Sequence, residues 1–124
     1  MLKVLIADDE HNIRHILDFS LNAEGFDVVA VHNGEDAFRM AVSDAPDLII
    51  LDVMMPGQGG IETCRILKED RRTADIPVIL LTARSDRKDR EEGMAAGADD
   101  YITKPFSPQK LVSTVQGILG STSK

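Results

Sequence analysis

The feature that most constrains the fold of this chain is a set of five short hydrophobic runs, each of which ends at polar residues. They lie near 2–7, 26–31, 47–52, 77–82 and 99–103, and stretches with helical periodicity separate them. Near-continuous runs of Val, Ile and Leu are typical of strands that are buried on both faces. The pattern therefore predicts five βα units in an α/β fold, with a parallel sheet, right-handed crossovers and helices on each side.

The length and composition fit a single globular domain. The 124 residues are 43% hydrophobic and 28% charged, and 14 Lys and Arg against 21 Asp and Glu give a formal charge of -7. This charge opposes direct binding to nucleic acid or to anionic membranes. The sequence shows no secretion signal, no apolar run long enough for a transmembrane helix and only one cysteine, Cys64, so we expect a cytoplasmic protein. We expect residues 1–120 to form the domain and 121–124 a flexible tail.

The polar residues at the ends of the runs predict a site. In an open parallel sheet, ligands bind beyond the carboxyl ends of the strands, where this chain places three carboxylates, a hydroxyl and an ammonium. The residues are Asp8, Asp9, Asp52, Thr82 and Lys104. Carboxylates that lie close together repel one another unless a cation compensates, and hard oxygen ligands beside open loops suit Mg²⁺. A hydroxyl and an ammonium beside such an ion suit a phosphoryl group, so the set indicates phosphoryl transfer.

In these residues and their spacing the chain resembles the receiver domain of two-component response regulators. The matching elements cover essentially the whole chain: Asp8-Asp9, Asp52 followed by Met55-Pro56 and Gly60, Thr82-Ala83, and Gly-Ala-Asp-Asp-Tyr-Ile-Thr-Lys-Pro-Phe at 97–106. The resemblance implies a flavodoxin-like, doubly wound (βα)5 fold with the strand order 2-1-3-4-5. It also implies a signalling switch of a phosphorelay, and not a conventional turnover enzyme.

The resemblance further implies how the acidic residues act. Asp52 would accept a phosphoryl group from a phosphohistidine on a sensor histidine kinase or a histidine phosphotransfer protein. Asp9 would bind Mg²⁺ directly, and Asp8 would act nearby, partly through water. The backbone carbonyl of Met54 would complete the protein ligands of the ion.

The remaining strand ends would bind the phosphoryl group and transmit its presence. Thr82 and the Ala83 amide would hold phosphoryl oxygens, and Lys104 would pair with the phosphorylated carboxyl. The Lys104-Pro105 peptide bond would be cis. Tyr101 matches the aromatic switch position, whose ring would move inward as Thr82 moves toward the phosphate. The switch would alter the binding of a downstream protein at the face 85–119.

Other interpretations of these residues remain open on sequence alone. Asp8 and Asp9 could be helix caps, and Tyr101 could be half-buried packing. A Mg²⁺-dependent phosphatase with an aspartyl nucleophile normally needs a second acid two residues after it, where this chain has Met54. A flavin-binding module is disfavoured because the acids at 8–10 would repel its phosphate. The sequence does not identify the kinase or the target, and it does not decide between a stand-alone protein and part of a longer regulator.

The chain departs from the pattern of the resemblance at two places. Gly59 stands where an Asp or Asn commonly precedes the glycine, which predicts a mobile loop after Asp52. No Arg occurs in 112–115, which argues against the salt-bridged dimer of many DNA-binding regulators. Met54 and Arg84 occupy the two positions that modulate how water reaches the phosphoryl group.

The segment 85–97 differs from the other helical segments because its first half has no apolar stripe. Only Met94, Ala95 and Ala96 are available to anchor it. The segment is therefore expected to be one of the least stable elements, which is where the moving parts of switches are often found. A simple solvated helix face is the alternative interpretation.

Overall fold

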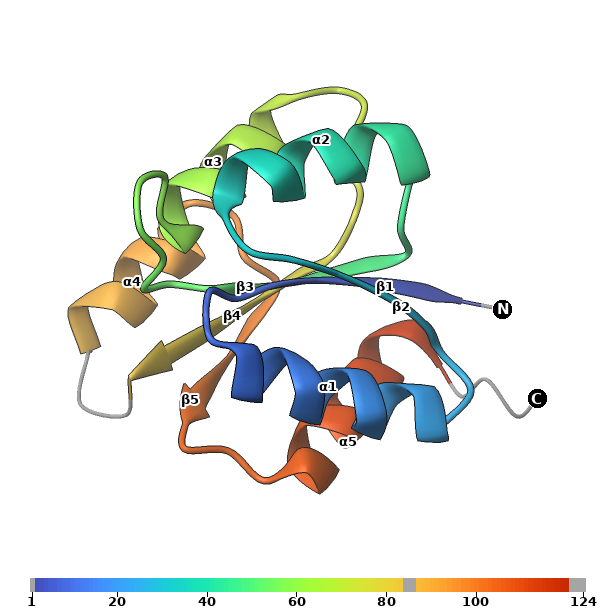
Figure 1. Cartoon of the computed structure of the whole chain (residues 1–124). Helices are drawn as coiled ribbons and strands as arrows, with labels where there is room; N and C mark the ends of the chain where they lie inside the picture. The colour runs from blue at the N-terminus through green and yellow to red at the C-terminus, as the bar shows by residue number, and fades with distance from the viewer. Residues whose placement is uncertain (1, 84–86, 121–124) are drawn as a thin grey trace.

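The structure is a computed structural model that describes residues 2–83 and 87–120. Strands and helices alternate along these residues as β1 Lys3–Ala7, α1 His11–Ala23, β2 Asp27–Val31, α2 Gly34–Asp44, β3 Leu48–Asp52, α3 Gly60–Glu69, β4 Val78–Ala83, α4 Arg87–Ala95, β5 Asp100–Lys104 and α5 Pro108–Leu119. Neighbouring strands are parallel and lie in the order β2-β1-β3-β4-β5 (Figure 1). The predicted (βα)5 fold and its strand order are confirmed.

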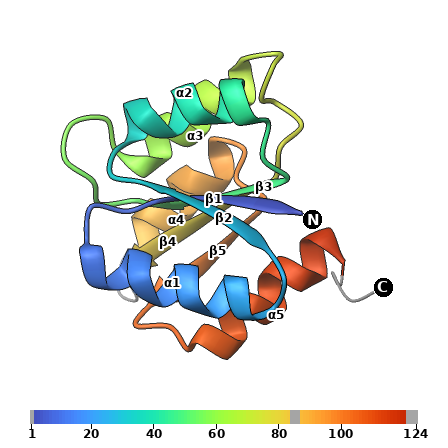
Figure 2. The ribbon, with the colours of Figure 1, turned by 45° about the vertical axis from the view of Figure 1, so that its right-hand side comes forward.

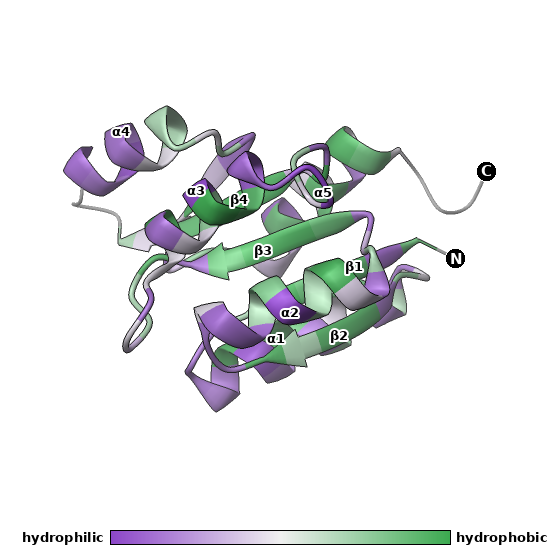
Figure 3. Cartoon of the chain, turned by 90° about the horizontal axis from the view of Figure 1, so that it is seen from above, coloured by the Kyte–Doolittle hydropathy of each residue, from purple (hydrophilic) through white to green (hydrophobic). Residues whose placement is uncertain are grey.

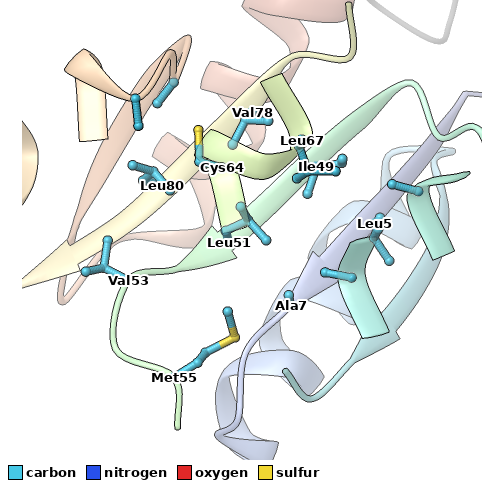
Figure 4. Packing of buried hydrophobic residues seen from close by; sticks show 14 of the residues in the cluster. Leu5, Ala7, Ile49, Leu51, Val53, Met55, Cys64, Leu67, Val78 and Leu80 are labelled. Carbon is cyan, nitrogen blue, oxygen red and sulfur yellow. The ribbon is translucent and has the colours of Figure 1, made fainter. Parts of the chain in front are cut away.

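The helices form two layers, with α1 and α5 on one face of the sheet and α2, α3 and α4 on the other (Figures 1 and 2). Side chains of a strand alternate between the two faces, so each strand contributes to two cores. In β1, for example, Val4 and Ile6 pack under α1 and α5, whereas Leu5 and Ala7 pack under α2 and α3. Figure 4 shows the second of these cores, which includes the buried Cys64. The central strands are accordingly hydrophobic along most of their length (Figure 3).

Local signals in the sequence fix two of the helix starts. The Asn33 side chain accepts a hydrogen bond from the backbone N–H of Asp36 at 2.8 Å, and the Ser107 hydroxyl accepts one from the N–H of Lys110 at 3.0 Å. Both contacts satisfy N–H groups that have no partner within the helix. Pro108 follows Ser107 in the first turn of α5, where its missing N–H costs nothing.

The packing of α4 corrects one sequence expectation. Met94 is 45% exposed and Ala95 is also exposed, so the prediction that they anchor this helix was wrong. The buried residues are Gly93, within α4, and Ala96, directly after it, so the prediction is confirmed for Ala96. A Cβ atom at Gly93 would lie 2.3 Å from Leu80 Cδ1, so a larger residue at this position would require the Leu80 side chain to shift. The first part of α4 is hydrophilic and only its end is hydrophobic (Figure 3), in agreement with the expected thin apolar contact.

Three sequence expectations concern residues outside the described ranges, namely Arg84, the first positions of the segment 85–97, and the tail 121–124. No helix within 2–83 or 87–120 has the length and hydrophobicity that crossing a membrane requires.

Candidate functional site

Asp8 and Asp52 meet because each extends a buried row of side chains at the carboxyl end of its strand, β1 or β3. β1 and β3 are paired with Ile6 opposite Ile50, and both side chains pack under α1 and α5. Asp8 and Asp52 come two residues later, so side-chain alternation directs them to the same face. Asp8 has no exposed surface and Asp52 is 2% exposed. The predicted convergence of these two strand ends is confirmed.

Lys104 lies among three carboxylates at the end of β5. Its Nζ is 3.2 Å from Asp52 Oδ2, 3.4 Å from Asp8 Oδ2 and 3.6 Å from Glu10 Oε1. One ammonium against three carboxylates leaves a local charge of -2 when all four groups are ionised. The site therefore favours an additional cation.

The surroundings of Asp52 disfavour its charged form. Burial raises the pKa of the Asp52 carboxyl from 3.8 to about 6, and the neighbouring Asp8 carboxylate also raises it, while Lys104 and the Met54 N–H lower it. For Lys104, burial lowers the pKa, but the nearby carboxylates, Asp52 and Asp8 above all, raise it by more. The Asp52 shift thus comes first from burial and then from the charge of Asp8, whereas the Lys104 shift comes from the surrounding carboxylates.

The acidic group that the structure brings together contains two of the expected acids, Asp8 and Asp52, and one that was not expected, Glu10. Asp8, Glu10 and Asp52 offer carboxylate oxygens that lie within 4.8 Å of one another, and within the described ranges this is the set that could hold a metal ion. Asp9 is exposed and is not a member of this set. Glu10 was missed, although it is the third acid of the run that ends β1. Since Mg²⁺ prefers hard oxygen ligands, the donor set fits this ion.

The loop after β3 and the end of β4 contribute groups around Asp52. The Met54 backbone N–H donates to Asp52 Oδ1 at 3.2 Å, while the Met54 side chain is 70% exposed. Thr82 follows Leu81, the residue paired with Asp52, and is buried. Its Oγ1 has no hydrogen-bond partner among the described residues. An unpaired buried hydroxyl costs free energy, so Thr82 is available to bind a ligand.

A groove of about 550 Å³ leads to the carboxylates from the side of α1. Its lining residues are Glu10, Ile13, Ile16, Asp52, Met54, Ala83, Lys104, Pro105, Phe106 and Pro108. The wall formed by α1 and the β5–α5 connection is apolar, and Ile16 is 39% exposed there. Ala83 is exposed beside the carboxylates, and the Lys104-Pro105 peptide bond is cis, as the resemblance implied.

Tyr101 lies on the outside of β5 and not in the groove. Its side chain is 37% exposed, and the guanidinium carbon of Arg90 lies 5.4 Å from the centre of its ring. This contact joins α4 to β5 by a cation–π interaction. The outward ring agrees with half-buried packing, and the switch role of Tyr101 stays a prediction.

Comparison with known proteins identifies the class to which this fold and site belong. The family model described as "Response regulator receiver domain" matches residues 4–116. The chain belongs to this family, and it is a receiver domain of a two-component system, a signalling switch.

Individual relatives agree with this assignment. The chain is 44% identical over 119 residues to the phosphate regulon transcriptional regulatory protein PhoB of Pseudomonas aeruginosa. The match covers 96% of this chain and 52% of that relative. It thus spans about half the length of that protein.

Solved structures of receiver domains match over almost the full length of both chains. A putative response regulator from Chloroflexus aurantiacus is 36% identical with a TM-score of 0.91, covering 95% of this chain and 97% of that one. The receiver domain of a sensor histidine kinase from Pseudomonas aeruginosa, whose structure holds a magnesium ion in the active-site cleft, is 29% identical with a TM-score of 0.88, covering 97% and 98%.

Proposed function

We propose that Asp52 is the phosphoacceptor of this receiver domain and that residues 1–120 form the functional unit. The observation that carries the proposal is the arrangement around one carboxylate. Asp52 is almost fully buried yet lines an open groove, and an ammonium lies 3.2 Å from it. On the adjacent strand lies a buried hydroxyl, that of Thr82, which has no hydrogen-bond partner within 2–83 and 87–120. Such a setting suits a nucleophile that must receive an anionic group.

The chemical step is an in-line transfer from a phosphohistidine. One Asp52 oxygen forms a bond to phosphorus as the phosphorus–nitrogen bond breaks, and the departing imidazole nitrogen keeps the electron pair and takes up a proton. Because the pKa of Asp52 is about 6, the carboxylate is largely anionic, and so nucleophilic, at pH 7 and above. Lys104 neutralises charge on the product, and the Thr82 hydroxyl with the Ala83 amide holds phosphoryl oxygens.

The ion for this site is Mg²⁺, which the related kinase receiver domain also holds. The residues that would hold it are Asp9, Asp52 and the Met54 carbonyl, with Asp8 acting partly through water. When bound, the ion would offset the repulsion between the carboxylate and the incoming phosphoryl group. Asp9 is exposed beside the acidic set, where it is free to turn toward an ion.

The partners are a sensor histidine kinase or a histidine phosphotransfer protein as donor, and a downstream protein as target. The apolar wall of the groove fits a helix that presents the phosphohistidine to Asp52, because Ile13, Ile16 and Phe106 flank the carboxylates. Phosphorylation would change target binding at the face 85–119. We expect this domain to act in the cytoplasm, without binding nucleic acid directly and without inserting into a membrane.

Phosphorylation by acetyl phosphate with Mg²⁺ tests this function. We expect intact-mass spectrometry to show one added phosphoryl group that hydroxylamine removes, as an acyl phosphate requires. Asp52→Asn should abolish the label, whereas Asp27→Asn, an exposed carboxylate at the opposite end of the sheet, should keep it. A normal label on the Asp52→Asn protein would contradict the assignment. Loss of label over time in the wild-type protein would measure its own dephosphorylation.

A further inference from the structure

Glu10 reaches into the carboxylate site from the start of α1. It holds the N-cap position of this helix, but its side chain makes no capping hydrogen bond. Its backbone N–H donates to Asp8 Oδ1 at 2.9 Å, and its own Oε1 lies 3.6 Å from Lys104 Nζ. The buried Asp8 therefore fixes the backbone at this point, and the long side chain of Glu10 extends to the ammonium.

The three carboxylates around Lys104 differ in their freedom to move. The side chains of Asp8 and Asp52 are 0% and 3% exposed, whereas that of Glu10 is 61% exposed. An ammonium has three N–H donors, and Glu10 at 3.6 Å is a more distant ionic partner of it than Asp52 at 3.2 Å or Asp8 at 3.4 Å. A phosphoryl group on Asp52 would bring further anionic oxygens, which would accept a hydrogen bond from one of the Lys104 N–H groups. Among the three present partners, Glu10 is the one that can move into water at low cost.

We propose that Glu10 is a positioning residue that holds Lys104 in the unphosphorylated domain and releases it when Asp52 is phosphorylated. The inference rests on the proposed roles of Asp52 and Lys104. Glu10 also lines the groove that reaches Asp52, and its carboxylate oxygen lies within 4.8 Å of an Asp52 oxygen, so added negative charge on Asp52 would repel it. Because the contact between Glu10 and Lys104 must break, its removal should favour the phosphorylated form. Exposed ion pairs are weak, and the expected gain is about two- to fivefold.

The test compares the affinity of four proteins for beryllofluoride, a mimic of the phosphoryl group on aspartate. Glu10→Gln removes the charge, and Glu10→Asp keeps the charge but shortens the side chain by one methylene, which should lengthen the 3.6 Å contact with Lys104. Glu62→Gln is the matched control, since Glu62 is an exposed carboxylate in the first turn of α3, in the groove on the other side of Met54. Amide NMR titrations follow binding, each at a Mg²⁺ concentration that saturates that protein.

We expect Glu10→Gln and Glu10→Asp to bind beryllofluoride about two- to fivefold more tightly than the wild-type and Glu62→Gln proteins. If Glu10→Asp matches the wild-type protein while Glu10→Gln gains affinity, the charge acts without the contact and the proposal fails. It also fails if both Glu10 variants match the wild type, or if Glu62→Gln gains as much as they do.

A second readout separates this proposal from the proposed function. Without mimic or Mg²⁺, the NMR signals of the Lys104 side chain should shift in both Glu10 variants and stay unchanged in Glu62→Gln. Unchanged Lys104 signals in every variant would show that Glu10 does not hold the ammonium. Wild-type protein that binds no beryllofluoride would overturn the role of Asp52 instead, and the Lys104 signals would still report on Glu10.

Discussion

Replacing Asp52 with Asn should stabilise the metal-free domain. The raised pKa shows that the folded protein disfavours the Asp52 carboxylate relative to the neutral acid, because burial and Asp8 outweigh Lys104. Asn is close to the carboxylate in shape and carries no charge. It therefore removes this penalty at neutral pH, and Lys104 keeps two carboxylates, on Asp8 and Glu10.

The magnitude follows from the pKa values of the folded and unfolded states. A rise from 3.8 to about 6 corresponds to an upper value of about 3 kcal/mol in the free energy of unfolding, at 1.36 kcal/mol for each pKa unit. For a domain of this size about 1 kcal/mol moves the melting temperature by about 4 °C, so the variant should melt up to about 10 °C higher.

The pH dependence has a definite sign. The folded protein binds the Asp52 proton more tightly than the unfolded chain, so protonation of Asp52 stabilises the fold. The penalty is absent below pH 3.8, grows as the pH rises to about 6, and is constant above it. The advantage of Asp52→Asn over the wild type should follow the same course.

Urea unfolding in EDTA, from pH 4 to pH 8, measures this advantage. Asp27→Asn is the control, an exposed carboxylate at the start of β2 that should leave stability unchanged at each pH. An Asp52→Asn protein that is no more stable than the wild type at pH 7.5 would refute the reasoning. So would an advantage of equal size at pH 4 and pH 7.5, because it could not come from the charge on Asp52.

Three further outcomes are expected. Mg²⁺ at 100 times its dissociation constant for the wild type should raise the free energy of unfolding by about 2.7 kcal/mol. At the same Mg²⁺ concentration, Asp9→Asn should gain less, while its metal-free stability stays unchanged. Equal melting shifts in both proteins would contradict a role of Asp9 as a ligand. In urea unfolding, Gly60→Ala should lose about 1–3 kcal/mol because its Cβ would lie 2.2 Å from the Asp52 carbonyl oxygen, while Gly117→Ala, which has open space, should gain about 0.5–1 kcal/mol. Beryllofluoride with Mg²⁺ should change hydrogen exchange in α4 and β5, and identical protection at full occupancy would rule out a switch at this face.

The sequence predicted the sheet and the meeting of its strand ends for one physical reason. Parallel strands that are buried on both faces must be hydrophobic throughout, so a polar residue marks where each strand leaves the core. The positions of Asp8, Asp52, Thr82 and Lys104 follow directly from this rule. Their register comes from the pairing of the strands, which places Asp8 and Asp52 beside each other.

The features that the sequence did not predict depend on side-chain direction and close tertiary contact. Nothing in the spacing of the acids at 8–10 shows that Glu10 points back to Lys104 while Asp9 faces solvent. The burial of Gly93 against Leu80 likewise depends on how closely α4 approaches the sheet. The sequence offered Met94, Ala95 and Ala96 as anchors because they are the apolar side chains of the segment, and such a pattern does not register a contact made at a glycine.

The arrangement of β5 explains how a change at the carboxylates can reach the surface. β5 is an edge strand that pairs with β4 alone, so its other edge is free of strand hydrogen bonds within the described sheet. It carries Lys104 at the carboxylate site and Tyr101 beneath Arg90 of α4, three residues apart. α4 itself is held to the core by small residues, among them Gly93 and Ala96. A ligand that moves Lys104 therefore acts on an edge strand, and the element next to that strand is the helix with the thinnest apolar contact.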